Sequence, residues 1–564
     1  MSATPKYNQR AWWKESVIYQ IYPRSFYDSN NDGVGDIKGI IAKLPYLQEL
    51  GVTMLWISPF YKSPMADNGY DIADYYAINP DFGAMQDVDA LIVQAREHGI
   101  QVMIDLVVNH TSDEHPWFQQ ALAQPESKYR DYYIFKPGVA DAPPNNWRSI
   151  FGGSVWEKVA GENCYYLHTF HRKQPDLNWE NPVLREEIYT MINWWLEKGV
   201  AGFRVDAITF IKKDQGFASL PADGVDGLAS IKWKARNQPG IELFLNELQE
   251  KTFKRYGCVT VGEAPGVPLQ EYDRFIGPDG YFDMIFDFHA ADIDVENGSE
   301  WFRRRNWTVS ELKEALFASQ HAFMQSGWGT TFIENHDQPR ALSKLIRNRD
   351  FHNGTGAKAL AAMYFFMHGT PFIYQGQELG MTNFSRQQIG EFDDISSIDN
   401  YHRALAEGFS ARQALEFVNQ RSRDNTRTPF PWANTVNGGF NQGAQPWLAF
   451  ASAEFSVNAQ DQQQQTDSVF HFYKRMIELR NQEFPQALIY GSFTPLENVA
   501  DNIIAYERRN ADQRLISITN MSDQPLSYAI PQGEVVLNNY DSVDSTLKPY
   551  QTILLKGCVK NEQI

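Results

Sequence analysis

The chain has 564 residues, of which 51 are Lys or Arg and 69 are Asp or Glu, giving a net charge of −18. This acidic balance argues against nucleic acid and membrane surfaces as partners, because both are themselves negatively charged. Three separated cysteines without a CxxC pair predict neither a disulfide framework nor a zinc site. The sequence contains no apolar run of membrane-spanning length and no secretory signal pattern, so we expect a cytoplasmic protein.

Short apolar runs alternate with helical stretches through much of the chain. Helices are predicted at 88–98 and 184–198, where apolar residues recur at helical spacing. Strands that alternate with helices are typical of a parallel sheet, and eight of them predict a (β/α)8 barrel with functional residues at the C-terminal strand ends. The predicted strands are 17–22, 52–57, 101–108, 202–205, 259–262, 284–286, 329–333 and 371–374.

Two departures from this alternation predict further domains. Residues 109–181 are rich in Pro, Gly, Asn, Asp and aromatic residues, and we interpret them as a subdomain inserted after the third strand. Short strands at hairpin spacing predict a C-terminal all-β sandwich over 484–564. The barrel then comprises 1–108 and 182–483, and the irregular stretch at about 383–451 is expected to form part of its rim.

Three of the predicted strands end at an acidic residue: Asp206, Glu263 and Asp337. Arg204 lies two residues before Asp206, so both side chains project from the same face of the strand. A neighbouring guanidinium lowers the pKa of a carboxylate, which suits a nucleophile, although a structural ion pair is the alternative. Glu263 has no arginine beside it in the sequence, which favours a higher pKa and an acid/base role. Glycoside hydrolysis needs these two kinds of carboxyl group.

The loop after the first strand carries oxygen ligands at alternating positions. These ligands predict a hard-cation site, with Ca²⁺ as the first choice and Mg²⁺ as the second, and a cation-free turn is the alternative. The twelfth position is Gly39, where an EF-hand requires Glu, so an EF-hand is excluded. The candidate ligands are Asp28, Asn30, Asp32, the carbonyl of Val34, and Asp36.

Four segments, 105–110, 202–206, Glu263 and 336–337, resemble the conserved regions of the α-amylase family, glycoside hydrolase family thirteen. Residues 174–178, Gln-Pro-Asp-Leu-Asn, resemble the fifth region of its oligo-1,6-glucosidase subfamily. The arginine-containing loop at 422–429 and the predicted metal loop are similar to those of the same subgroup. The resemblance implies a catalytic barrel with a domain inserted after strand three and a C-terminal β domain.

The resemblance also implies roles for individual residues. Asp206 is the expected nucleophile, Glu263 the acid/base and Asp337 the stabiliser that holds the ring hydroxyls, with Arg204 orienting Asp206. The residues expected at the pocket for the terminal glucose are Asp67, Tyr70, His110, Phe151, Phe170, His336 and Arg423. The implied activity is that of a retaining, exo-acting α-glucosidase that acts on short oligosaccharides through a covalent glucosyl-enzyme, with carboxyl oxygens about 5 to 5.5 Å apart.

The residue after the expected nucleophile bears on the linkage. Ala207 stands where isomaltose-cleaving relatives are expected to carry Val, and a small residue there favours α-1,4 over α-1,6 bonds. An oligo-1,6-glucosidase, a transglucosidase and a sucrose isomerase are alternatives, and the sequence at 340–343 does not match the loop expected of an isomerase. A non-enzymatic, amylase-like transporter heavy chain would require a membrane span. We expect an oligosaccharide substrate and a monomer or weak homo-oligomer.

Overall fold

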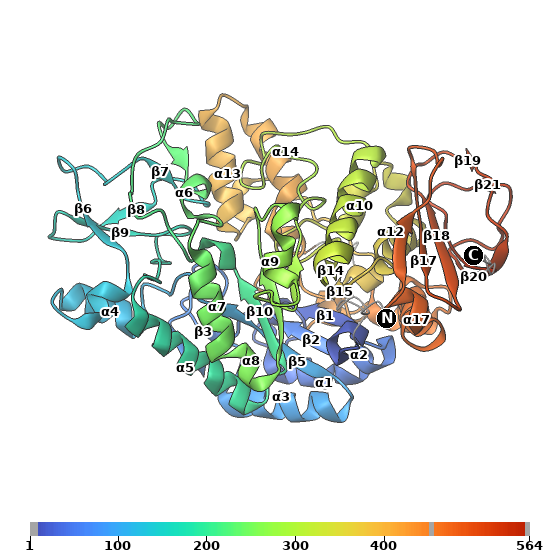
Figure 1. The fold of residues 1–564 in the computed structure, drawn as a ribbon, viewed down its shortest axis with the longest axis horizontal. Helices are drawn as coiled ribbons and strands as arrows, with labels where there is room; N and C mark the ends of the chain where they lie inside the picture. The colour runs from blue at the N-terminus through green and yellow to red at the C-terminus, as the bar shows by residue number, and fades with distance from the viewer. Residues whose placement is uncertain (1–9, 451–455, 559–564) are drawn as a thin grey trace, which may run out of the picture.

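The computed structural model describes residues 10–450 and 456–558 (Figure 1). Its centre is a sheet of eight parallel strands in the order β13-β12-β10-β5-β2-β1-β15-β14. The strands are β1 Ile18–Ile21, β2 Met54–Ile57, β5 Gln101–Val107, β10 Gly202–Asp206, β12 Val259–Glu263, β13 Met284–Phe286, β14 Thr330–Thr331 and β15 Thr370–Tyr374. Most of their residues are buried on both faces, as expected of parallel strands covered by helices.

The order of the strands curls the sheet into a nearly closed barrel. Strands that are consecutive in the chain lie side by side from β1 to β13, and β15 returns to pair with β1. At the seam, the Thr330 hydroxyl of β14 donates a hydrogen bond to the Ile285 carbonyl of β13 at 3.1 Å. The predicted (β/α)8 fold is therefore confirmed.

Helices cover the outside of the barrel, and α5 shows how the sequence defines one of them. Asn181 precedes the helix, and its side chain accepts from the backbone N–H of Val183; Pro182 occupies the first turn, and Gly199 ends the helix in a left-handed conformation. The helices are α1 Ile37–Ala42, α2 Leu44–Leu50, α3 Met85–Glu97, α4 Pro116–Ala123, α5 Pro182–Lys198, α6 Lys232–Ala235, α7 Ile241–Lys251, α8 Phe253–Tyr256, α9 Tyr272–Ile276, α10 Val309–Ser326, α11 Ala341–Leu345, α12 Gly354–Phe365, α13 Ile395–Ala406, α14 Ala411–Arg421, α15 Ala459–Gln464, α16 Val469–Glu478 and α17 Pro485–Leu488.

The chain between β5 and α5 leaves the barrel and forms a small subdomain at one end of the molecule (Figure 1). Its sheet has the order β6-β9-β8, formed by Phe135–Pro137, Cys164–Leu167 and Trp156–Lys158, and β7 (Trp147–Arg148) pairs with β11 (Ala229–Ser230). Its apolar cluster includes Trp147 and Leu167 together with Ala207 and Phe210 from the loop after β10. This shared packing fixes the subdomain against the end of β10.

The C-terminal part is an all-β domain at the opposite end of the molecule (Figure 1). A five-stranded antiparallel sheet has the order β16-β17-β18-β22-β20, and β19 pairs with β21. The strands are β16 Ser492–Pro495, β17 Ile503–Arg509, β18 Arg514–Asn520, β19 Leu526–Ser527, β20 Gly533–Asn538, β21 Thr546–Leu547 and β22 Thr552–Gly557. The predicted all-β character of this part is confirmed.

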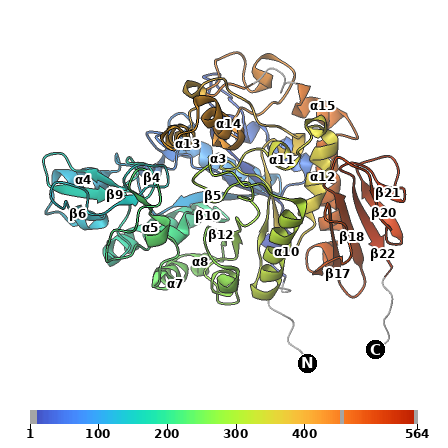
Figure 2. The same ribbon diagram turned by 90° about the horizontal axis from the view of Figure 1, so that it is seen from above.

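The sequence interpretation expected an irregular stretch at 383–451, but part of this stretch is helical. It contains the helix pair α13 and α14, which lie side by side above the barrel in Figure 2. Ser410 and Gln413 form a capping box at the start of α14, a local signal that the prediction overlooked. The last residue of the predicted stretch, residue 451, lies outside the described part of the chain.

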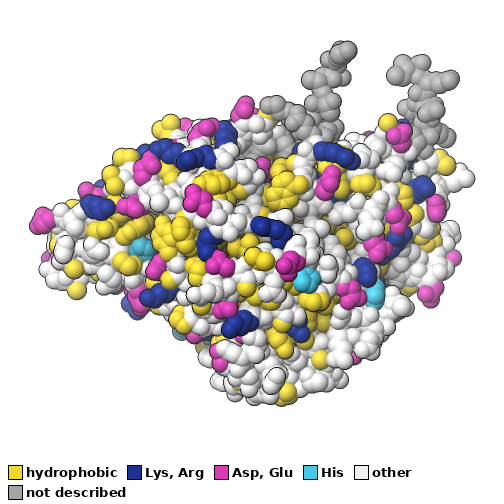
Figure 3. Space-filling view, turned by 90° about the horizontal axis from the view of Figure 1, so that it is seen from below, with side chains coloured by type: hydrophobic (Ala, Val, Ile, Leu, Met, Phe, Trp, Pro, Cys, Tyr) yellow, Lys and Arg dark blue, Asp and Glu magenta, His cyan; other side chains and the backbone are white. Residues whose placement is uncertain are grey.

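Within residues 10–450 and 456–558, none of the helices combines the length and apolar character needed to cross a bilayer. On the face in Figure 3, basic and acidic side chains are interspersed among apolar ones.

Candidate active site

The buried guanidinium of Arg204 lies at the centre of the site. Its Nη1 is 2.8 Å from Asp105 Oδ1 and 2.6 Å from Asp206 Oδ1, and its Nη2 is 3.0 Å from Glu263 Oε2. The strand register explains this arrangement, because Arg204 on β10 is paired with Asp105 on β5 and with Val261 on β12. Glu263 therefore lies beside Asp206 at the C-terminal end of the sheet. The single guanidinium of Arg204 therefore contacts three carboxylates.

This sharing corrects two expectations from the sequence. Glu263 has an arginine in contact through space, although none is near it in the chain, so its separation from arginine in the sequence is not kept in the fold. The pKa of Asp206 is raised rather than lowered. Burial is the main cause and outweighs the lowering effect of the Arg204 charge, and the charges of Glu263 and Asp105 add to the rise. Burial also raises the pKa of Asp105 to about 6.

The backbone after Asp206 ties the two carboxylates together. Ala207 has φ 43°, which places it in the left-handed region that favours glycine, and the short helix Ile208–Phe210 follows. In this conformation the N–H of Ala207 donates to Glu263 Oε2 at 2.7 Å. A left-handed alanine costs about 1 kcal/mol. The charge-assisted hydrogen bond to Glu263 offsets that cost.

Asp337 has its own set of cationic and polar partners. Its Oδ1 is 2.9 Å from Arg427 Nη2 and 3.4 Å from Arg423 Nη1, and its Oδ2 is 3.1 Å from His336 Nε2. Burial acts to raise the pKa of Asp337, but the positive partners outweigh it and hold the pKa below its usual range. Burial lowers the pKa of His336 to about 3, so the imidazole is neutral at neutral pH. Asp337 is therefore a stable anion.

The residues predicted to hold a terminal sugar converge on one cavity of about 980 Å³. Arg423 Nη2 is 3.1 Å from Asp67 Oδ1, and the side-chain amide of Gln174 donates to Asp67 Oδ2 at 3.0 Å. The predicted residues that line the cavity are Asp67, Tyr70, His110, Phe151, Phe170, Asp206, Ala207, Glu263, Asp337 and Arg423. Arg204, expected to orient Asp206, and His336, expected at the glucose pocket, are buried and are not among the residues that line the cavity.

Aromatic rings shape the cavity on two sides. Tyr70 stacks on His336 with ring centroids 5.4 Å apart and an interplanar angle of 11°. Phe151 and Phe170 have centroids 5.7 Å apart, and the Arg423 guanidinium lies 5.1 Å from the Phe151 ring centroid. The arrangement combines an apolar wall with fixed polar groups, which suits a sugar ring.

Three supporting residues received no role in the sequence interpretation. Asp105 accepts from Arg204, and Asp394 accepts from Arg423 Nε at 2.8 Å. The side chain of Gln174 bridges Asp67 and His110. An acidic residue within the apolar run 101–107 was a signal for Asp105, because an unpaired charge is rarely buried. Asp394 contacts Arg423 from another element, which no local pattern indicates.

The predicted cation loop uses its acidic side chains mainly to bind its own backbone. Asp28 Oδ1 accepts from the N–H of Asn31 at 2.7 Å, and Asp36 caps α1 by accepting from the N–H of Gly39 at 2.6 Å. Among the described residues, no three His, Cys, Asp or Glu side chains are grouped as they would be around a metal ion. The oxygen atoms of this loop are of the type that binds Ca²⁺, but the hydrogen bonds that they accept also account for a turn without a cation. Calcium at this loop stays a prediction.

Replacing Arg204 with Gln leaves the buried Asp105 and Asp206 and the partly exposed Glu263 without their common cation. We expect the free energy of unfolding at neutral pH to fall by about 3 to 5 kcal/mol. The loss should shrink at lower pH, because protonated carboxyl groups need no counter-charge. Urea unfolding at two pH values measures both effects, and Arg204→Lys, which keeps the charge but not the planar fork, should lose less. A loss below about 1 kcal/mol would show that the carboxylates do not depend on Arg204.

Residues 20–491 match the model of the α-amylase catalytic domain. An oligo-1,6-glucosidase of Bacillus cereus is 40% identical over 97% of this chain and 100% of its own length, and a trehalose-6-phosphate hydrolase of Bacillus subtilis is 39% identical over 98% and 99%. The crystal structure of an isomaltulose synthase from Klebsiella sp. LX3 superposes with a TM-score of 0.91 at 39% identity, covering 97% of this chain and 99% of that one. The chain belongs to the α-amylase family of glycoside hydrolases.

Proposed function

We propose that this enzyme is a retaining, exo-acting α-glucosidase that releases terminal glucose from short oligosaccharides. The observation that carries the proposal is that Asp206 and Glu263 contact the same guanidinium, that of Arg204, and line one cavity together with Asp337. Retaining glycosidases need two carboxyl groups about 5 to 5.5 Å apart, and two groups held by the same side chain are consistent with that separation.

In the first step Asp206 attacks the anomeric carbon of the terminal glucose. Glu263 gives a proton to the glycosidic oxygen, the bond to the leaving sugar breaks, and a glucosyl ester forms on Asp206. In the second step Glu263 takes a proton from water, and the water oxygen replaces Asp206 at the anomeric carbon. Two inversions return the α configuration.

The contacts with Arg204 bear on this division of work between Asp206 and Glu263. Double displacement begins with one ionised carboxylate and one protonated carboxyl group. The pKa of Asp206 is raised mainly by burial, while the charge of Arg204 acts to lower it. In our proposal Asp206 is the ionised carboxylate, because Arg204 Nη1 makes the shorter contact with it, 2.6 Å, against 3.0 Å from Nη2 to Glu263 Oε2. Glu263 also accepts from the N–H of Ala207.

Exo action follows from the polar groups assigned to the terminal glucose. The Arg423 guanidinium contacts Asp67, Asp337 and Asp394, so it holds two acids that line the cavity and is itself held from behind. Fixed, mutually paired groups recognise a sugar with its hydroxyls in one arrangement and reject others. We propose that they bind the non-reducing glucose and that the leaving sugar occupies the wider part of the cavity.

The proposal also specifies which glucosidic linkage the enzyme cleaves. We favour α-1,4 over α-1,6 cleavage because Ala207 leaves space beside Asp206. The Bacillus cereus relative is named an oligo-1,6-glucosidase, which supports isomaltose cleavage as the second candidate. Because the chain is similar to an isomaltulose synthase, transfer of the glucosyl group to a sugar instead of to water is a further alternative.

The proposal is tested by incubating the enzyme with maltose, isomaltose, sucrose, trehalose and maltotriose and following released glucose, its anomer and any new disaccharide. We expect α-glucose as the first product from at least one substrate. Replacing Asp206 with Asn should lower kcat by about a thousandfold or more, with an unchanged circular dichroism spectrum, because the amide cannot form the ester. Release of β-glucose, or retained activity in the folded Asn variant, would contradict the mechanism.

Replacing Ala207 with Val should shift the linkage preference. The added methyl groups reduce the space beside Asp206, so the ratio of kcat/KM for isomaltose to that for maltose should rise by about tenfold or more. The variant should also lose about 1 kcal/mol of stability, because a β-branched residue is strained at φ 43°. Ala207→Gly is the matched control, since it relieves the backbone and adds space, and it should keep the maltose preference. An unchanged ratio in the Val variant would remove Ala207 as the linkage determinant.

A further inference from the structure

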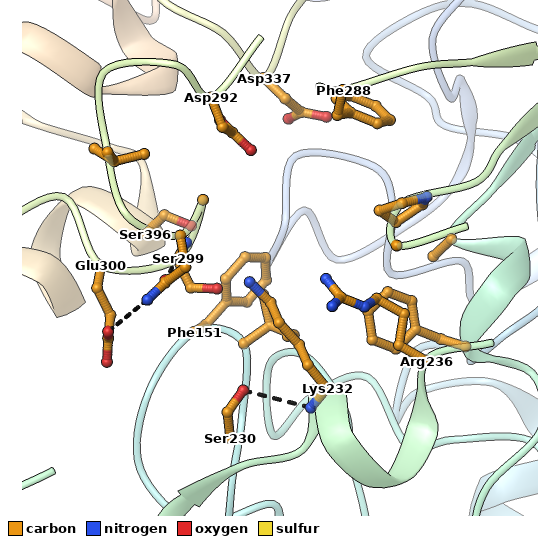
Figure 4. Close-up of a pocket in the computed structure, with 18 of the residues that line it drawn as sticks. Phe151, Ser230, Lys232, Arg236, Phe288, Asp292, Ser299, Glu300, Asp337 and Ser396 are labelled. Carbon is orange, nitrogen blue, oxygen red and sulfur yellow. Dashed lines mark hydrogen bonds between the residues drawn. The ribbon is translucent and has the colours of Figure 1, made fainter. Parts of the chain in front are cut away.

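Two cationic side chains, Lys232 and Arg236, line the same cavity as Asp206, Glu263 and Asp337. Lys232 begins α6 and Arg236 follows its last residue. Figure 4 shows both side chains reaching into one open space, with Asp337 on the far side of it. Within the described part of the chain, neither side chain has an acidic partner at ion-pair distance, and neither makes a side-chain hydrogen bond. They are therefore free to bind a ligand.

Three of the acidic residues nearby already have other partners. Asp292 lies 2.7 Å from Arg421, Glu300 lies 2.8 Å from Arg303, and Asp223 lies 2.5 Å from Arg148. Glu296, which also lines the cavity, is exposed and lies outside ion-pair distance of both cations. Among the described residues no acid therefore pairs directly with Lys232 or Arg236, although Asp292 and Glu300 are near enough for their charge to act on Lys232.

Burial makes the charge on these two side chains costly. Desolvation lowers the pKa of Lys232 to about 8; the charge of Arg236 also acts to lower it, and the charges of Asp292 and Glu300 act to raise it. Desolvation also lowers the pKa of Arg236. With a pKa of about 8, Lys232 is largely protonated at neutral pH, and the Arg236 guanidinium keeps its charge because arginine is not deprotonated in proteins. A bound anion would replace the lost hydration with charge-assisted hydrogen bonds.

The backbone next to Glu263 is shaped around Arg236. A Cβ at Gly266, three residues after Glu263, would lie 2.2 Å from Arg236 Nε, and φ at this glycine is 75°. The loop after β12 thus passes close to the guanidinium because residue 266 lacks a side chain. Since Glu263 is the group that protonates the leaving oxygen, Arg236 lies on the side of the leaving sugar.

We propose that Lys232 and Arg236 bind an anionic group on the leaving sugar, so that the preferred substrates are α-glucosides of a sugar phosphate or a sugar acid. The inference rests on the proposed function and specifies its substrate class. Hydrolysis breaks the glucosidic bond and consumes one water, and the phosphate ester or carboxylate leaves unchanged on the released sugar. A phosphate monoester carries a charge of about −1.5 to −2 at neutral pH, which two cations match.

The test compares substrates that differ in one group. Maltose is compared with maltose phosphorylated on its reducing glucose, and with maltobionate, which carries a carboxylate on the leaving unit. We expect kcat/KM to be higher by about tenfold or more for at least one anionic substrate, and the difference to decrease as salt is added. The phosphate and carboxylate arms distinguish the two kinds of anion.

Variants assign the effect to the two cations. Lys232→Met and Arg236→Met should each lower the ratio of anionic to neutral kcat/KM by about tenfold. Lys234→Met is the matched control, because Lys234 lies on the same helix but pairs with Asp214 and does not line the cavity, and it should keep the ratio. Glucose 6-phosphate should inhibit more strongly than glucose, and Lys232→Met should remove that difference.

The failure of this inference is distinguishable from the failure of the proposed function. Turnover of maltose with equal kcat/KM for the neutral and anionic members of both pairs would overturn the anionic subsite and leave the α-glucosidase intact. Absence of turnover with every α-glucoside would overturn the proposed function. In that case, calorimetry with glucose 6-phosphate still decides the subsite: binding that Lys232→Met weakens supports it, and no binding overturns it.

Discussion

One buried guanidinium, that of Arg204, joins the ends of three neighbouring strands. Its contacts with Asp105, Asp206 and Glu263 follow from the parallel register of β5, β10 and β12. Three carboxylates this close repel one another and are costly to bury, so the arrangement depends on the shared cation. The same interaction places the two carboxyl groups that the proposed chemistry requires.

The sequence was informative where local pattern determines structure. Strand-end acids such as Asp206 and Asp337 were predicted to meet because the C-terminal ends of barrel strands lie at one face, and both line one cavity in the structure. Contacts that depend on packing between distant elements could not be predicted from the sequence. The contact of Glu263 with Arg204 depends on strand register, and the expected pKa of Asp206 was wrong because burial and two more acids outweigh one arginine. The α14 helix was missed although Ser410 marks its start.

The cavity divides into two parts with different electrostatics. Around Arg423, acids and cations are paired, which suits a neutral sugar bound through its hydroxyls. Around Lys232 and Arg236, positive charge is left unpaired among the described residues, which suits an anion. The end of β12 and the loop after it connect the two parts, because β12 ends at Glu263 and the loop carries Gly266 against Arg236. In the proposed function, recognition of the terminal glucose and of the leaving group is assigned to separate side chains.

The central claim, that Asp206 forms a glucosyl ester while Arg204 holds it in place, is tested most directly by trapping that ester. A fluorinated α-glucosyl fluoride slows the second step more than the first, so a retaining enzyme accumulates the covalent intermediate. Mass spectrometry of the digested protein then locates the added sugar. The account predicts one glucosyl group on the peptide that carries Asp206. A label on Glu263 or Asp337, or turnover without any label, would contradict it.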